Sequence, residues 1–91
     1  MIDVKQAVKS AESYARELYQ KDELRHLRLE EVELSDDGRQ WKVTLGWLEP
    51  AVSRNGLIVN GGVHRLPRVY KRFEIDAETG TVSSMKIRDP N

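Results

Sequence analysis

The 91-residue sequence predicts an α+β domain in which one N-terminal helix packs on a four-stranded antiparallel sheet. Apolar residues recur at helical spacing near the N-terminus and alternate strictly in later segments. Glycine-containing turn signals separate these later segments. Consecutive strands joined by tight turns usually pair as neighbours, so the predicted order is a 1-2-3-4 meander. One face of such a sheet buries the helix, and the other faces water.

The helix is predicted to begin after Asp3 and to end near Gln20. Asp3 can accept from backbone N–H groups as the N-cap, and Gln6 three residues later completes a capping-box pair. The apolar stripe is narrow and rich in alanine: Val4, Ala7, Val8, Ala11, Ala15 and Leu18. We expect this helix to pack on the core, with a partner-binding helix as the alternative. Residues 21–25 form a charged connection.

The first predicted strand, 26–35, changes the phase of its apolar residues half-way along. Leu27 and Leu29 share one parity, whereas Val32 and Leu34 share the other. A strand of period two cannot bury both pairs on one face, so we predict a β-bulge near residues 30–31. The sequence Asp-Asp-Gly at 36–38 then indicates a tight turn.

Residues 40–48 are predicted to form the central strand. Their apolar side chains all fall on one face: Trp41, Val43, Leu45 and Trp47. These include both tryptophans of the chain, and aromatic side chains bury the largest areas in a core. This strand should therefore pack against the helix and have a neighbour along each edge.

The central strand is expected to end at Glu49-Pro50, because proline cannot donate to the ladder. Residues 51–66 show no firm period. Two turn signals, at 55–56 and 60–62, flank the apolar run 57–59. The segment is either a long loop or a small hairpin arm, and long insertions in compact domains are often functional.

Residues 68–76 and 81–88 predict the third and fourth strands, joined by an Asp-Ala-Glu-Thr-Gly turn. Phe73 and Ile75 share one parity and are expected to face the helix. Val82 is out of phase with the later apolar residues of its strand, so it is expected to mark the entrance of that strand.

The alanine-rich helix, the Trp-Lys-Val-Thr-Leu strand after an Asp-Asp-Gly turn, and the run 73–87 together resemble a PepSY-type, cystatin-like domain. In that run an apolar-aromatic strand, an acidic-Ala-x-Thr-Gly turn and a short strand follow one another. The resemblance implies a binding or inhibitory module, often directed towards peptidases, and it supplies no catalytic residues. Members of that family are commonly secreted or membrane-attached. This chain departs from them by lacking an export signal and by its glycine-rich insertion at 53–66.

The length of the chain predicts a single domain spanning residues 1–91. Hydrophobic residues make up 38% and charged residues 33% of the chain, which is typical of a globular domain. The chain has no cysteine, so a disulfide scaffold and a thiolate metal site are excluded. No signal-peptide pattern and no apolar run of about 20 residues is present, so the expected location is the cytoplasm, without a membrane.

No motif predicts catalytic residues, a cofactor or a metal. His26 and His64 are the only histidines, and they lack the spacing of metal ligands, so solvent-exposed side chains are expected. The serines lack a nucleophile-elbow context. The glycine clusters match neither a Walker A loop nor a dinucleotide-binding turn.

Charge is unevenly distributed along the chain. Residues 22–37 contain seven acidic side chains, whereas residues 51–73 contain five basic and no acidic ones. Because these stretches should flank the central strand on opposite sides, they either pair across strands or form a polarised surface that docks a charged partner. A weak nucleic-acid interaction through the basic stretch 54–72 is a further alternative. Overall neutrality and the nearby carboxylates disfavour it.

The favoured hypothesis is a non-enzymatic protein-interaction module of the binding or inhibitory type. Its docking surface would combine the 51–66 segment with the adjoining strand face, through Arg54, Leu57, Ile58, Val59, His64, Arg65 and Tyr70. The reason is the apolar run 57–59, since exposed apolar patches mark interaction sites. The same arm could pair with a second copy of the chain and give a homodimer. The alternative is a small-ligand-binding domain or minor enzyme that uses the concave sheet face.

Overall fold

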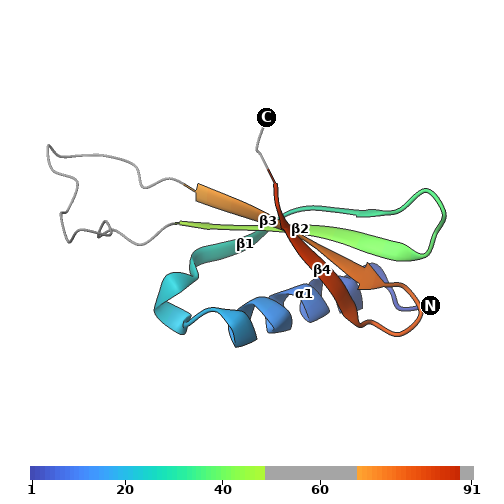
Figure 1. Ribbon diagram of the computed structural model, residues 1–91, viewed down its shortest axis with the longest axis horizontal. Helices are drawn as coiled ribbons and strands as arrows, with labels where there is room; N and C mark the ends of the chain where they lie inside the picture. The colour runs from blue at the N-terminus through green and yellow to red at the C-terminus, as the bar shows by residue number, and fades with distance from the viewer. Residues whose placement is uncertain (49–67, 89–91) are drawn as a thin grey trace, which may run out of the picture.

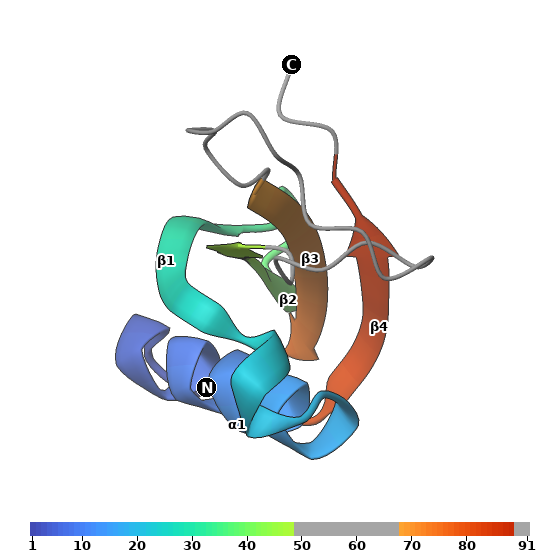
Figure 2. The same ribbon diagram turned by 90° about the vertical axis from the view of Figure 1, so that its left-hand side faces the viewer.

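The computed structural model describes residues 1–48 and 68–88 and confirms the predicted α+β class (Figure 1). A single long helix covers one face of an antiparallel sheet of order β1-β2-β3-β4 (Figure 2). The elements are α1 (Val4–Leu18), the 3₁₀ helix η1 (Lys21–Glu23), β1 (Arg25–Leu34), β2 (Gln40–Leu48), β3 (Arg68–Asp76) and β4 (Val82–Ile87). The predicted arm at 51–66 lies outside the described residues.

The strand bounds follow the sequence pattern most closely where the alternation is strict. β2 and β3 span the predicted residues, β1 is shifted by one residue, and β4 is shorter than the predicted 81–88. The charged connection after α1 contains η1, which the sequence pattern did not predict. The Gln20 N–H donates to Glu23 Oε1 at 2.7 Å at the start of this 3₁₀ turn.

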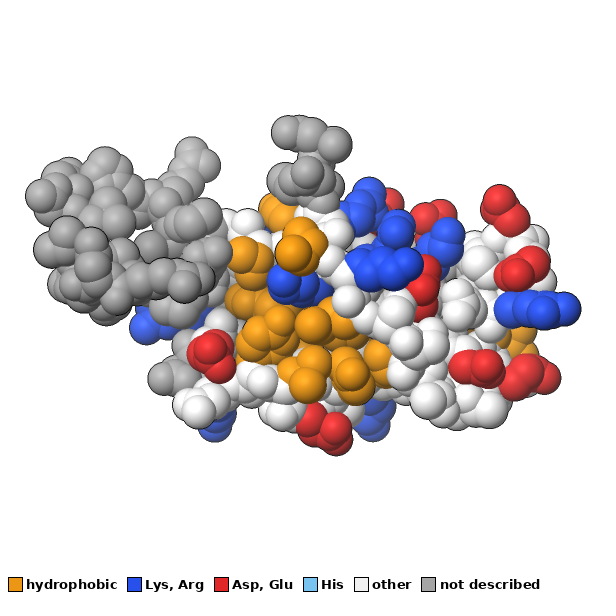
Figure 3. Space-filling model, viewed as in Figure 1, with side chains coloured by type: hydrophobic (Ala, Val, Ile, Leu, Met, Phe, Trp, Pro, Cys, Tyr) orange, Lys and Arg blue, Asp and Glu red, His pale blue; other side chains and the backbone are white. Residues whose placement is uncertain are grey.

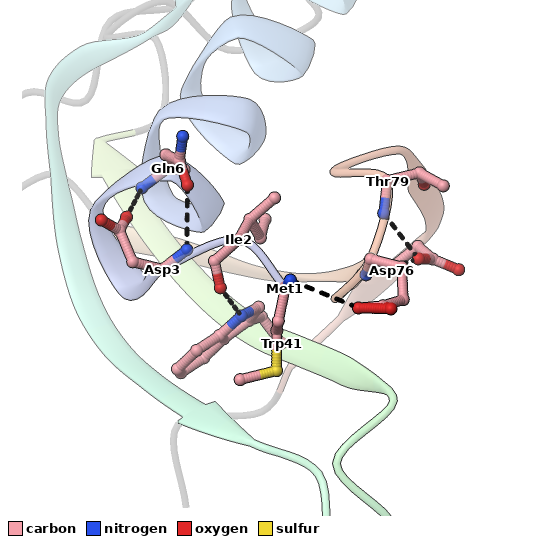
Figure 4. Close-up of polar contacts among 8 residues, drawn as sticks. Met1, Ile2, Asp3, Gln6, Trp41, Asp76 and Thr79 are labelled. Atoms are coloured by element: carbon pink, nitrogen blue, oxygen red, sulfur yellow. Dashed lines mark hydrogen bonds and ion pairs between the residues drawn. The ribbon is translucent and has the colours of Figure 1, made fainter.

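The predicted capping box of α1 is present (Figure 4). The Gln6 N–H donates to Asp3 Oδ1 at 2.8 Å, and the Asp3 N–H donates to Gln6 Oε1 at 2.9 Å. The helix lays its alanine stripe on the sheet, and Ala7, Ala11 and Ala15 are completely buried. Because alanine adds only a methyl group, the helix backbone can lie close to the strands.

The core lies between α1 and the two central strands. Its largest fully buried side chains are Val43, Leu45, Phe73 and Ile75. Two tyrosines of the helix layer extend this core by ring contacts. Tyr14 meets Phe73 edge-on with 6.1 Å between ring centroids, and Tyr19 packs on Trp47 at 5.1 Å. The expected packing of the tryptophan face against the helix is confirmed, with Trp47 only 4% exposed.

The N-terminal residues are held by backbone and side-chain hydrogen bonds at the end of the sheet where the β3–β4 turn lies. The Ile2 N–H donates to the Ala77 carbonyl at 2.7 Å. Trp41 is half-buried, and its Nε1–H donates to the Ile2 carbonyl at 3.2 Å (Figure 4). Trp41 thereby satisfies its only polar atom while its ring packs on the core.

The predicted bulge in β1 is confirmed, because the pairing register with β2 shifts between Leu29 and Glu31. A second, unpredicted shift lies between Arg25 and Arg28, where His26 has a positive φ of 53°. The shift between Leu29 and Glu31 puts Leu29 and Val32 on the same side of the sheet, opposite Leu45 and Val43. The bulge therefore resolves the phase change that the sequence shows.

The prediction that Val82 marks the entrance of its strand is confirmed, since β4 begins at this residue, and a bulge that the sequence pattern did not predict accounts for its change of phase. Ser84 pairs with Glu74 and Val82 pairs with Ile75, so Ser83 is an extra residue in β4. This bulge returns Val82 to the helix-facing side, where it packs against the core. The two predicted glycine turns are confirmed, with φ of +71° at Gly38 and +78° at Gly80.

Candidate functional site

The structure describes only one residue of the predicted docking set. Tyr70 lies on β3 opposite Gly46, half-buried, on the sheet face that points away from α1. The other predicted residues lie outside the described part of the chain: Arg54, Leu57, Ile58, Val59, His64 and Arg65. Leu48 and Arg68, which precede and follow residues 49–67, form a cross-strand pair. The predicted arm is thus connected to one end of the β2–β3 hairpin.

The sheet face away from α1, here called the outer face, carries an ion-pair cluster centred on Glu30. Glu30 Oε2 accepts from Arg28 Nε and from Arg68 Nη2, each at 3.0 Å. Arg68 Nη2 also donates to the His26 carbonyl at 3.3 Å. Glu30 and Arg68 are mostly buried, with 21% and 17% of their side chains exposed, so solvent screens this pair less than a fully exposed one.

Gly46 provides the space that the Glu30 side chain occupies. A Cβ at this position would lie 2.5 Å from Glu30 Oε2 and 3.0 Å from Glu30 Cγ. Any larger residue would therefore push the carboxylate away from its arginine partners. The glycine, which weakens a strand by itself, is explained by this close approach.

The protonation of Glu30 is set by two opposing effects. Burial raises the pKa of this carboxyl, but the hydrogen bonds from Arg28 and Arg68 lower it by more. The pKa of Glu30 therefore ends below its usual value, and the carboxylate is ionised at neutral pH. A charged acceptor on β1 thus holds the first residue of β3.

A second ion pair spans the outer face from one edge strand to the other. Arg88, just after β4, donates to Glu31 of β1 through Nη1. Thr44 of β2 lies opposite Glu31 in the register and is only 3% exposed, although it is polar. In the described residues Arg68 of the basic stretch pairs with Glu30 of the acidic stretch across β2, as one of the two sequence interpretations predicts.

The inner, helix-facing side of the sheet is only partly covered by α1. The register places Val69 opposite Trp47, Lys71 opposite Ile87, and Met85 opposite Phe73. We call the four residues Val69, Lys71, Met85 and Ile87 the β3–β4 patch. Ile87 is 80% exposed, and the other three are half-buried. Figure 3 shows hydrophobic side chains gathered into one area on the molecular face where β4 and α1 lie.

Two grooves run beside the helix. The groove between α1 and β1 has a volume of about 430 Å³, and Val8, Leu29 and Val32 contribute to its mainly apolar lining. The groove between α1 and the β3–β4 turn has a volume of about 510 Å³ and is more polar, with Ser10 and Thr79 in its wall. The helix therefore does not seal the sheet completely.

Comparisons with protein-family models, with curated proteins and with solved structures found no match to this chain. The resemblance to PepSY-type, cystatin-like domains therefore stays a prediction. In residues 1–48 and 68–88 no helix has the length and apolar character that a membrane span requires. The same residues contain no cluster of three or more histidine, aspartate or glutamate side chains suited to a metal ion.

Proposed function

We propose that this domain is a non-enzymatic protein-interaction module, of the binding or inhibitory kind, with the β3–β4 patch and the predicted 51–66 arm as its docking surface. The observation that carries the proposal is the exposure of Ile87, 80%, on the inner face. An isoleucine left in water forgoes about 1.5–3 kcal/mol of burial free energy. Grouped apolar side chains of this kind mark interaction sites.

The patch is built on rigid elements, which favours recognition. Val69 and Met85 pair with the core residues Trp47 and Phe73, and Tyr19 packs on Trp47. Side chains backed by a packed core lose little conformational entropy when they bind a partner. Arg68, the first residue of β3, is fixed by Glu30, so the strand that carries Val69 is also held from the outer face.

The predicted arm and the β3–β4 patch are connected through β3. Residues 49–67 are followed directly by Arg68 and Val69, and Val69 belongs to the patch. A partner that touches the patch therefore lies next to the C-terminal end of the segment for which the sequence predicts an apolar run. This connection supports one continuous docking surface, and that surface could also accept a second copy of the chain.

The test compares four forms of the protein by size-exclusion chromatography with light scattering and by retention of co-purified partners. They are the wild type, a deletion of residues 55–62, Ile87→Lys and the control Leu34→Lys. Leu34 is 37% exposed and lies at the opposite end of the sheet, next to the 36–38 turn. We expect the deletion and Ile87→Lys to lose partner or self-association, while Leu34→Lys keeps it. Equal assembly in all four forms would overturn the proposal.

A small-ligand-binding function is the second candidate, and the groove between α1 and β1 supports it. Its apolar lining and volume of about 430 Å³ suit a drug-sized ligand. Val8→Trp would fill this groove without touching the β3–β4 patch. If a ligand binds there, the Trp variant should lose its thermal stabilisation by that ligand and keep the assembly state of the wild type.

A further inference from the structure

β4 is the last strand of the sheet, and in the described residues only its β3 side is paired. The Arg88 N–H donates to the Tyr70 carbonyl of β3 at 3.0 Å. Backbone groups of successive strand residues alternate in direction. The N–H and C=O groups of Lys86 therefore also point toward β3, whereas those of Met85 and Ile87 point to the free edge. An unpaired row of this kind is a template for another strand.

Along β4 and Arg88, apolar side chains lie on one face of the sheet and basic side chains lie on the other. Met85 and Ile87 lie on the inner face, and Lys86 and Arg88 lie on the outer face. The Lys86 side chain is 58% exposed, and its distance of 3.8 Å to Glu74 is too long for a hydrogen bond. Its ammonium group therefore keeps donors for an incoming carboxylate.

We propose that the free edge of β4 binds an extended segment of a partner protein as a fifth strand, in which acidic and apolar residues alternate. The acidic side chains would face Lys86, and the apolar ones would pack beside Met85 and Ile87. This inference rests on the proposed function and specifies its partner class. Backbone hydrogen bonds supply affinity in such strand addition, and the alternate side chains supply specificity.

The other edge of the sheet is less suited to strand addition. β1 contains two register shifts, between Arg25 and Arg28 and between Leu29 and Glu31. Bulges of this kind twist an edge and interrupt its row of hydrogen-bonding groups. The only shift in β4 lies at its beginning, so the segment from Ser84 to Arg88 offers a regular ladder.

The side-chain part of the inference is tested with two capped, fluorescein-labelled heptapeptides of alternating valine and glutamate, or valine and lysine. Fluorescence polarisation should show about tenfold tighter binding of the glutamate peptide, a preference that weakens with salt. The variant Lys86→Glu should reverse the preference. A structural defect in the variant would lower the affinity for both peptides by the same factor and would not reverse the preference. Equal affinity of the two peptides for either protein would overturn the inference.

The backbone part is tested with Ile87→Pro and its control Ile87→Val. Proline removes the N–H that faces the free edge and spares the bonds to β3, and edge strands tolerate it there. We expect Ile87→Pro to abolish binding of the glutamate peptide and Ile87→Val to retain it. Wild-type binding by the proline variant would overturn strand addition.

Failure of this inference is distinguishable from failure of the proposed function. If neither peptide binds but Ile87→Lys still abolishes assembly, the docking surface stands and the β4 edge is excluded as a strand template. If the wild-type protein without peptide has twice the mass of the chain and Ile87→Pro makes it monomeric, the edge accepts a second copy. That result would overturn the partner-peptide assignment.

Discussion

On the inner face of β2, Val43 and Leu45 are covered by the alanine stripe of α1 and are fully buried. On the outer face of the same strand, Thr44 and Gly46 are also buried, but their neighbours on β1 are charged: Glu31 lies opposite Thr44 in the register, and the Glu30 side chain lies against Gly46. The contrast shows that the middle of β2 is buried on both faces although a helix covers only one. On the outer face, long side chains held by ion pairs take the place of a helix, and we call them the outer cover.

The two covers should differ in strength and in their response to conditions. Burial under α1 removes apolar area from water, and this contribution does not depend on pH or moderate salt. The outer cover depends on pairs such as Glu30 with Arg68, which weaken with salt and with protonation of the carboxylate. Substitutions on the two faces of one strand therefore separate these contributions.

The largest effect is expected for Phe73→Ala on the inner face. Phe73 is completely buried and meets Tyr14 edge-on, so its truncation leaves a cavity and should cost about 3–5 kcal/mol of unfolding free energy. Tyr70→Ala on the outer face of the same strand is the matched control, and its loss should be less than half as large. Urea denaturation of both variants measures the difference, and equal losses would contradict the comparison.

The inner face could be predicted from the sequence because it depends on local periodicity. Strict alternation gave the bounds of β2 and β3, and the phase change around residues 30–31 gave the bulge in β1. The bulge at Ser83 could not be predicted in the same way. One out-of-phase valine fits both a frayed strand entrance and an extra residue, and only the pairing with β3 decides between them.

For the outer face, the sequence predicted which strands carry charged residues but not which of these side chains contact each other. The contact between Glu30 and Arg68 joins residues 38 positions apart, and it requires both the β1 bulge and Gly46. The β3–β4 patch was missed for a different reason. A helix of 15 residues is about 22 Å long, whereas nine-residue strands extend for about 30 Å, so part of the inner face must lie beyond α1.

The second prediction concerns Gly46, which lies against Glu30 at the centre of the ion-pair cluster. Gly46→Ala places a methyl group on the Glu30 carboxylate and should cost about 1 kcal/mol, because the flexible acid can shift but loses the hydrogen bond that it accepts from Arg68. In a Glu30→Ala background the same change should become neutral or slightly stabilising. A double-mutant cycle by urea denaturation gives the coupling energy, and additive effects would show that Gly46 does not serve Glu30.

The smallest effect concerns Glu74, at the β4 side of the outer face. The Ser84 hydroxyl donates to Glu74 Oε1 at 2.7 Å, which lowers the pKa of this carboxyl below its usual value despite partial burial. A lowered folded-state pKa adds stability above the usual pKa, and this contribution is lost as the pH falls through the folded-state value. Ser84→Ala should therefore cost about 0.5–1 kcal/mol at neutral pH and almost nothing in acid.

Ser83→Ala is the matched control for that experiment, because the Ser83 hydroxyl donates to the Glu74 backbone carbonyl and not to its carboxylate. Its cost should be the same at neutral and acidic pH. A urea denaturation series from pH ~7 to pH ~2 extends below the usual pKa range of a glutamate, on the side to which the Glu74 pKa is lowered, and separates the two serines. If Ser84→Ala lost as much stability in acid as at neutral pH, its hydroxyl would not act through the ionised carboxylate. The β4 side of the outer cover would then depend on packing, like the inner face, and only the Glu30 cluster would distinguish the two faces.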